Sequence, residues 1–217
     1  MKAVLFDFDY TLADSSVGIV DCINYALERM GESRRGHQAC CDTIGLSLNR
    51  AYNRLTGKVD PAREAEFFRL FLEQADRVMV DNTRLYDGIH EMVDQLNQRN
   101  IALAIVSTKF RMRIEQILRR GDLADAFPVI VGGEDVTNHK PHPEGMELAL
   151  SRLGITGREA VYVGDSIVDA KAAQSGNIPF IAVLSGRTPA SDFVAFQPLS
   201  VINSVSELPK ALNVLDN

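Results

Sequence analysis

Three short apolar runs in the sequence are each followed by polar side chains that could do chemistry. The runs are residues 3–6, 102–106 and 160–164, and their near-continuous apolar character is typical of strands buried on both faces of a parallel sheet. Because parallel strands bind ligands at their carboxyl ends, we expect the residues that follow these runs to converge. They are Asp7, Asp9, Ser107, Thr108, Asp165 and Asp169, joined by Lys140 from a proline-rich loop.

The charges of this set predict a bound divalent cation. Four aspartates in one crevice would raise one another's pKa unless positive charge neutralised them. Lys140 supplies +1 and a divalent cation +2, which leaves −1 (−4 + 1 + 2), so protonation of one carboxyl would give a neutral site and a general acid. Carboxylates and carbonyl oxygens favour a hard cation, and Mg²⁺ is the usual one beside a phosphate. The sequence has no His/Cys cluster with the spacing of a zinc site.

The same residues indicate phosphate chemistry. A hydroxyl (Ser107), an ammonium (Lys140) and a cation would surround a carboxylate with groups that bind phosphate oxygens. The sequence has neither a GxxxxGK[ST] loop nor a GxGxxG loop, so the phosphate is not expected on a nucleotide-binding loop. A carboxylate beside a metal-bound phosphate can attack phosphorus to give an aspartyl phosphate. A second carboxyl two residues further on can protonate the leaving oxygen and then take a proton from water.

The elements that must position these groups are alternating strands and helices. Apolar residues spaced by three and four predict helices within 89–96, 114–118 and 146–153, and further strands are predicted at 128–131, 179–184 and 200–202. This alternation predicts an α/β fold, a doubly wound, Rossmann-like parallel sheet.

Residues 15–80 break this alternation, because they contain helical patterns only. We therefore predict an all-helical cap domain at 15–80, inserted after the first strand, and an α/β catalytic core formed by 1–14 and 81–217. An insert at that point would lie over the crevice where such sheets bind ligands.

Composition narrows the function classes. The chain has 217 residues, of which 46% are hydrophobic and 24% charged, as in globular proteins of one or two domains. Its formal charge of −6 argues against nucleic acid or an anionic membrane as a partner. No apolar stretch approaches the ~20 residues of a membrane helix. The odd cysteine count, with two cysteines adjacent, is unlike a disulfide framework, so we expect a cytoplasmic protein. We expect a monomer or a homodimer.

Four motifs together resemble those of the haloacid dehalogenase superfamily of phosphatases. DFDYTL at 7–12 is similar to its DxDxT[LV] signature, VSTK at 106–109 to its second motif, KP at 140–141 to its third and GDSIVD at 164–169 to its fourth. The motifs occur in the family order and with family-like spacing, and the resemblance covers essentially the whole chain. The helical insert looks like the first cap type of the family, as in phosphoglycolate phosphatases, β-phosphoglucomutases and phosphonatases.

The resemblance implies a role for each matching residue. Asp7 would be the nucleophile and a Mg²⁺ ligand, and Asp9 the general acid and base, with its backbone carbonyl also on Mg²⁺. The remaining roles would be phosphate binding by Ser107, Thr108 and Lys140, Mg²⁺ coordination by Asp165, and a supporting outer-shell role for Asp169.

The resemblance implies a Mg²⁺-dependent phosphatase that hydrolyses a small phosphorylated metabolite, similar to phosphoglycolate, through an aspartyl phosphate. Asp9 disfavours the dehalogenases and phosphonatases of the family, which lack an aspartate there. A sugar-phosphate mutase of the β-phosphoglucomutase type shares every core residue and stays open. From a different class, a phospho-receiver or a phosphate-binding module without catalysis is the other alternative. The Asp-x-Asp spacing and the helical insert disfavour a receiver, and the intact pair Asp7 and Asp9 disfavours a binding module.

Three further residues bear on the substrate. Tyr10 stands where these enzymes commonly carry glycine, so its ring could narrow the leaving-group pocket. Arg50 and Arg54 of the insert could pair with a substrate carboxylate, as phosphoglycolate would require, although a solvated helix face is the alternative interpretation.

Overall fold

The computed structural model describes residues 1–215, which form two compact units. One unit comprises Met1–Ala13 together with the chain from Leu85 onward, and the other is Asp14–Arg84. The helical unit thus includes Asp14 and residues 81–84 in addition to the predicted 15–80. The assignment of one unit as catalytic core and the other as cap stays a prediction.

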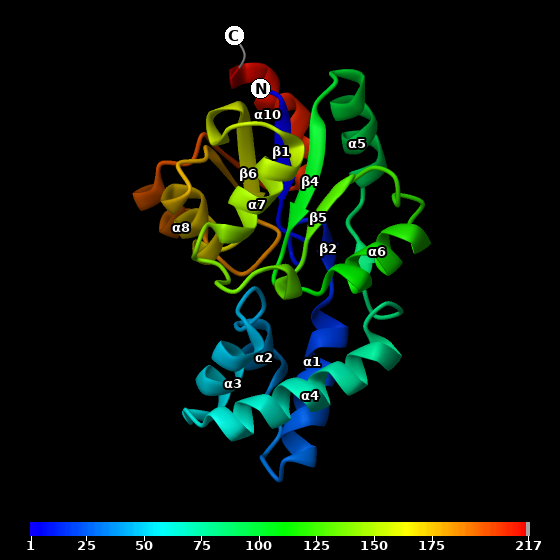
Figure 1. Cartoon of the computed structure of the whole chain (residues 1–217), viewed down its shortest axis with the longest axis vertical. Helices are drawn as coiled ribbons and strands as arrows, with labels where there is room; N and C mark the ends of the chain where they lie inside the picture. Colours follow the sequence, from blue (N-terminus) through cyan, green and yellow to red (C-terminus); the bar gives the residue numbers. More distant parts are fainter. Residues whose placement is uncertain (216–217) are drawn as a thin grey trace. The chain divides into compact units, whose positions relative to one another are not determined.

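The first unit is built on a six-stranded parallel sheet of order β5-β4-β1-β6-β7-β8 (Figure 1). The strands are β1 (Ala3–Phe6), β4 (Ala102–Val106), β5 (Val129–Val131), β6 (Ala160–Gly164), β7 (Phe180–Val183) and β8 (Ser200–Ile202). The chain builds outward from β1 on one side and then on the other, which is the order of a doubly wound sheet. The predicted α/β fold class is therefore confirmed.

The central strand is buried on both faces, as its continuous apolar run predicted. All four side chains of β1 are 0% exposed. In the sheet register, Phe6 pairs with Ile105 of β4 and Val163 of β6, so the three strands end level with one another. The residues that follow these strands are consequently delivered to one edge of the sheet, at the point where the strand order reverses.

Helices cover this sheet. They are α5 (Ile89–Gln98), α6 (Arg111–Arg120), α7 (Glu144–Leu153), α8 (Ile167–Ser175), the short α9 (Ala190–Phe193) and α10 (Leu208–Leu215). The apolar residues of α7 and α8, among them Met146 and Ala170, pack with Leu5 and Tyr162 of the sheet in one buried cluster. Burial of each large side chain of this kind stabilises the fold by about 1.5–3 kcal/mol.

The second unit is helical apart from the strand residues at its two ends. Its helices are α1 (Ser16–Arg29), α2 (His37–Cys41), α3 (Leu48–Thr56) and α4 (Pro61–Val78), and the short strands β2 (Ala13–Asp14) and β3 (Arg84–Leu85) pair where the chain enters and leaves it. Asp60 caps α4, because its Oδ1 accepts hydrogen bonds from the N–H groups of Ala62 and Arg63. The buried core includes Leu27, Tyr52 and Phe67.

None of the helices within residues 1–215 has both the length and the apolar character that crossing a bilayer requires.

Candidate active site

Asp7 and Asp9 follow β1, and a tight turn of the backbone holds them. The N–H of Asp7 still belongs to the sheet, donating to the carbonyl of Val163 at 2.9 Å. Tyr10 then has φ of 60°, and its carbonyl accepts a hydrogen bond from Oγ of Ser185 at 2.5 Å. Glycine adopts a positive φ more easily than other residues do, which explains why the enzymes that this sequence resembles commonly carry glycine at this position. Tyr10 is 8% exposed, and its effect on a leaving-group pocket stays a prediction.

Lys140 lies at the centre of the site. Its ammonium is 2.9 Å from Oδ1 of Asp7, 2.6 Å from Oδ1 of Asp169 and 3.1 Å from the hydroxyl of Tyr162. The Tyr162 hydroxyl in turn donates to the carbonyl of Val106 at 2.9 Å, which fixes it against the end of β4. The lysine side chain is only 5% exposed, so these contacts act with little screening by water. Sequence reasoning did not assign Tyr162 a role.

Asp169 supports Lys140 and also caps a helix. It is 0% exposed, and its Oδ2 accepts hydrogen bonds from the N–H of Ser166 at 3.1 Å and from Oγ of Ser166 at 2.6 Å. This reciprocal pairing is a capping box at the start of α8. Gly164 leaves room for the carboxylate, because a Cβ at that position would lie 2.6 Å from Cβ and Cγ of Asp169. Asp169 is therefore fully engaged by protein groups.

Asp165 completes a cluster of carboxylates. One carboxylate oxygen from each of Asp7, Asp165 and Asp169 lies within 4.8 Å of the other two. Thr11 donates to Oδ1 of Asp165 at 3.4 Å, and a Cβ at Gly186 would overlap Oδ2 of Asp165. The predicted metal set also contained Asp9, through its backbone carbonyl, and that residue contributes no side-chain oxygen to this cluster.

A second buried lysine changes the charge balance that the sequence suggested. Lys109 is 9% exposed, and its ammonium lies 3.0 Å from Oδ1 of Asp9. The sequence analysis placed Lys109 in the second motif but gave it no role, and it counted Lys140 as the only positively charged side chain of the site. With both lysines, the four aspartates leave −2 (−4 + 2) rather than −3, a charge that one divalent cation would balance. The available signal was its position just beyond β4, at the same sheet edge.

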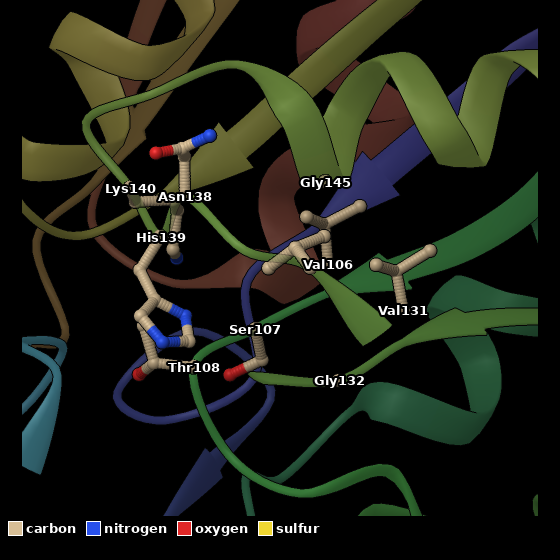
Figure 2. Close-up of a pocket in the computed structure, with 10 residues that line it drawn as sticks. Val106, Ser107, Thr108, Val131, Gly132, Asn138, His139, Lys140 and Gly145 are labelled. Carbon is tan, nitrogen blue, oxygen red and sulfur yellow. The ribbon is translucent and has the colours of Figure 1, made fainter. Parts of the chain in front are cut away.

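The predicted phosphate-binding hydroxyls line a small pocket of about 10 Å³ that is partly open to solvent. Figure 2 shows Ser107 and Thr108 on its wall together with His139. The N–H of Ser107 donates to the carbonyl of Val131 at 3.0 Å, which anchors it to β5. Lys140 also lines this pocket, so the structure brings Ser107, Thr108 and Lys140 together.

Burial and charge shift the pKa values of the carboxylates in this site. Burial raises the pKa of Asp7 to about 6, against an opposing effect of Lys140, and Asp169 raises it further. Burial, together with the charges of Asp169 and Asp7, raises the pKa of Asp165 well above its usual range. Burial alone would lower the pKa of Lys140, but the charges of Asp169 and Asp7 outweigh it and raise the pKa above its ordinary value. The ammonium of Lys140 therefore stays charged, whereas the carboxyl groups of Asp7 and Asp165 keep their protons to a higher pH than an ordinary aspartate does.

The raised pKa of Asp7 predicts a pH-dependent stability in protein kept free of divalent cations. Between the unfolded value of 3.8 and the folded value of about 6, the folded state holds a proton that the unfolded state has released, so rising pH destabilises the fold. Asp7→Asn removes this effect. Relative to wild type, we expect the unfolding free energy of Asp7→Asn to increase by about 2 kcal/mol between pH 4 and pH 7. Urea unfolding in EDTA at both pH values measures the difference, and parallel pH profiles would contradict the expectation.

The two predicted cap arginines, Arg50 and Arg54, lie one turn apart on α3 of the helical unit, and both are exposed. Their side chains are available to a ligand or to solvent, and their contact with a substrate stays a prediction.

Buried aspartates and lysines at the carboxyl edge of a doubly wound parallel sheet form a ligand-binding site of the α/β class, and comparison with known proteins gives the family. Residues 4–183 match the model of the haloacid dehalogenase-like hydrolases. The phosphoglycolate phosphatase of Salmonella typhi is 30% identical over 99% of this chain and 93% of its own length, and that of Escherichia coli K12 is 28% identical with the same coverage. The chain thus belongs to the haloacid dehalogenase-like hydrolase family, and it is a phosphatase.

Solved structures agree. A haloacid dehalogenase-like hydrolase of Bacteroides fragilis is 40% identical, with a TM-score of 0.93, over 95% of this chain and 99% of that one. A predicted phosphatase of Clostridium acetobutylicum, 24% identical, has a TM-score of 0.90 over 100% and 99%, which shows the shared fold. Since the chain belongs to this hydrolase family and is a phosphatase, the alternatives of a phospho-receiver or a phosphate-binding module without catalysis are wrong.

Proposed function

We propose that the chain is a Mg²⁺-dependent phosphatase that hydrolyses a small phosphomonoester through an aspartyl phosphate on Asp7. The observation that carries the proposal is the environment of this carboxylate. It follows the central strand, it is 2% exposed, and its Oδ1 has the ammonium of Lys140 at 2.9 Å. A carboxylate fixed beside a permanent cation, at the binding edge of the sheet, is placed to attack a phosphorus whose oxygens the cation holds.

The donor set fits Mg²⁺. Among the described residues, the buried Oδ1 atoms of Asp7 and Asp9 accept no hydrogen bond of good geometry, although each has a lysine ammonium nearby. Only oxygen donors are offered, which suits a hard cation. The side chains of Asp7 and Asp165 and the carbonyl of Asp9 would hold the ion, whereas Asp169 is already engaged by Lys140 and Ser166. When bound, the ion would polarise a phosphoryl oxygen and offset the negative charge.

The residues then divide the chemistry in two steps. In the first, an oxygen of Asp7 forms a bond to phosphorus, the bond to the leaving oxygen breaks, and Asp9 gives that oxygen a proton. In the second, Asp9 takes a proton from a water molecule that attacks phosphorus, and the bond between phosphorus and Asp7 breaks. Ser107, Thr108 and Lys140 bind the oxygens of the transferring group throughout.

The substrate in this proposal is a small phosphorylated metabolite similar to phosphoglycolate, since the relatives with matching length carry the name phosphoglycolate phosphatase. Arg50 or Arg54 would pair with its carboxylate, and Tyr10 would lie near its leaving group. We extend the proposal to a cytoplasmic enzyme, because its three cysteines are buried thiols. We also propose that it is a monomer or a homodimer. A sugar-phosphate mutase of the β-phosphoglucomutase type has the same core residues and is the second candidate.

A panel of phosphorylated metabolites tests the proposal. Phosphate release is measured with Mg²⁺ and with EDTA, over phosphoglycolate, sugar phosphates, nucleotides and pyrophosphate. We expect turnover of a small monoester that EDTA abolishes. Interconversion of sugar phosphate isomers without phosphate release would favour the mutase, and turnover that is unchanged in EDTA would overturn the metal requirement.

Gly186 offers a geometric test of the metal site. A Cβ at this position would overlap Oδ2 of Asp165, so Gly186→Ala must displace either the loop or the carboxylate. A displacement of about 1 Å can cost about 10²-fold in rate. We expect the activity to fall by roughly that factor and the Mg²⁺ concentration for half-maximal activity to rise.

Gly36→Ala is the matched control, since a Cβ there has open space around it and the backbone φ is −60°. Titration of activity with Mg²⁺ gives the comparison. If Gly186→Ala behaves like Gly36→Ala, Asp165 tolerates displacement and is not a ligand.

A further inference from the structure

The second buried lysine, Lys109, has no role in the mechanism above. We propose that Lys109 is a positioning residue, which holds the carboxylate of Asp9 where it can exchange a proton with the leaving oxygen. The inference rests on the proposed function, because Asp9 is the acid and base of that reaction. It assigns separate lysines to the two aspartates of the Asp-x-Asp pair: Lys140 contacts Asp7, and Lys109 contacts Asp9.

The backbone of Lys109 is fixed on both sides. Its N–H donates to Oγ of Ser107 at 3.3 Å, and its carbonyl accepts from the N–H of Gly133 at 3.1 Å. Gly133 permits this close approach, because a Cβ there would overlap the carbonyl oxygen of Thr108. The lysine therefore starts from a rigid point at the end of β4.

From this anchor the side chain reaches across to the end of β1. The side chain is 5% exposed, and its ammonium lies 6.0 Å from the ring centroid of Phe8 and 3.0 Å from Oδ1 of Asp9. Phe8 is 0% exposed and fixed in the core, so the ring and the carboxylate together define the position of the ammonium.

Asp9 needs such a partner. Its side chain is 8% exposed, and its Oδ1 is buried and accepts no hydrogen bond of good geometry from residues 1–215. As Asp9 gives its proton to the leaving oxygen it becomes an ionised carboxylate, which without a counter-charge would turn toward solvent, because desolvation of the charge is costly. The ion pair with Lys109 offsets that cost and keeps Asp9 in the site.

This role has a kinetic signature that a general structural role lacks. Proton donation to the leaving oxygen matters most when the leaving group is a poor one, such as an alkoxide, and least when it is p-nitrophenolate. Removal of the Lys109 ammonium should therefore slow the reaction more, the higher the pKa of the leaving group is. The value of kcat/KM reports this, since it covers the steps up to departure of that group.

The experiment compares Lys109→Met and Lys109→Gln with wild type on substituted phenyl phosphates and on an uncharged alkyl phosphate. We expect kcat/KM to fall by about 10²-fold for the alkyl phosphate and by less than about threefold for p-nitrophenyl phosphate. Lys109→Arg should restore most of the loss. Lys171→Met, on the exposed face of α8, is the matched control and should leave all values unchanged.

A double-mutant cycle completes the test. In an Asp9→Asn background, Lys109→Met should add no further loss, because the group that it positions has been removed. An equal loss on every leaving group, a loss that adds in full to that of Asp9→Asn, or no loss at all would overturn the role of Lys109. Failure of the proposed function looks different, because wild type itself would then release no phosphate from any monoester.

Discussion

Asp7→Asn is expected to reduce phosphatase activity by about 10⁴-fold or more, the largest effect that we predict for a single substitution. The amide has nearly the shape of the carboxylate, so the end of β1 should keep its structure, but its nitrogen and oxygen cannot attack phosphorus as a carboxylate does. Steady-state phosphate release measures the loss, and circular dichroism checks that the fold is retained.

Asp94→Asn is the matched control, because Asp94 is exposed on α5, away from the strand ends. An independent readout is the enzyme itself. Because water attacks phosphorus and not the carboxyl carbon, Asp7 keeps its own oxygens, so the intermediate is trapped instead: borohydride added during turnover should reduce the aspartyl phosphate to homoserine, which mass spectrometry finds in the peptide containing Asp7. An Asp7→Asn preparation that keeps more than about a hundredth of wild-type activity, without conversion of the amide back to aspartate, would place the nucleophile elsewhere.

Lys140→Met should give the second-largest loss, at least about 10²–10³-fold at pH 7. Two effects combine. The transferring group loses the ammonium, and Asp7 loses the charge that lowers its pKa, so that more of it is protonated at neutral pH. Part of the activity should therefore return as the pH is raised. A pH–rate profile of kcat/KM measures this displacement, which should be toward higher pH.

Stability should change in the same variant. Asp7 and Asp169 would remain buried without their cation, and removal of one partner of a buried ion pair typically costs about 3–5 kcal/mol. The loss should shrink at acid pH, where the carboxylates take up protons instead. Lys171→Met is again the control, and a Lys140→Met variant as stable as that control at pH 8 would show that the carboxylates do not depend on this ammonium.

The sheet and most of the site could be predicted from the sequence for a physical reason. A strand buried on both faces must be apolar throughout, as 3–6, 102–106 and 160–164 are, and the carboxyl ends of parallel strands share one edge. Asp7 and Lys140 therefore meet as predicted, at 2.9 Å.

The contributions of Lys109 and Tyr162 could not be predicted in the same way. A lysine after a strand is most often solvated, and a tyrosine within a buried strand reads as apolar packing. Both act here through partners distant in sequence, Lys109 through Asp9 and Tyr162 through Lys140 and Val106. Arg50 and Arg54 present a further case, since sequence gives their place on a helix but not what their side chains meet.

The capping box at α8 links turnover to the integrity of a single helical turn. One oxygen of Asp169 receives the N–H and hydroxyl of Ser166, and the other receives the ammonium of Lys140. Fraying of that turn would let the carboxylate rotate and release the lysine while the strands stay paired. Under heat or mild denaturant, the enzyme would thus lose its activity through local opening of this turn before its sheet unfolds. A return to native conditions would restore the activity without refolding of the sheet.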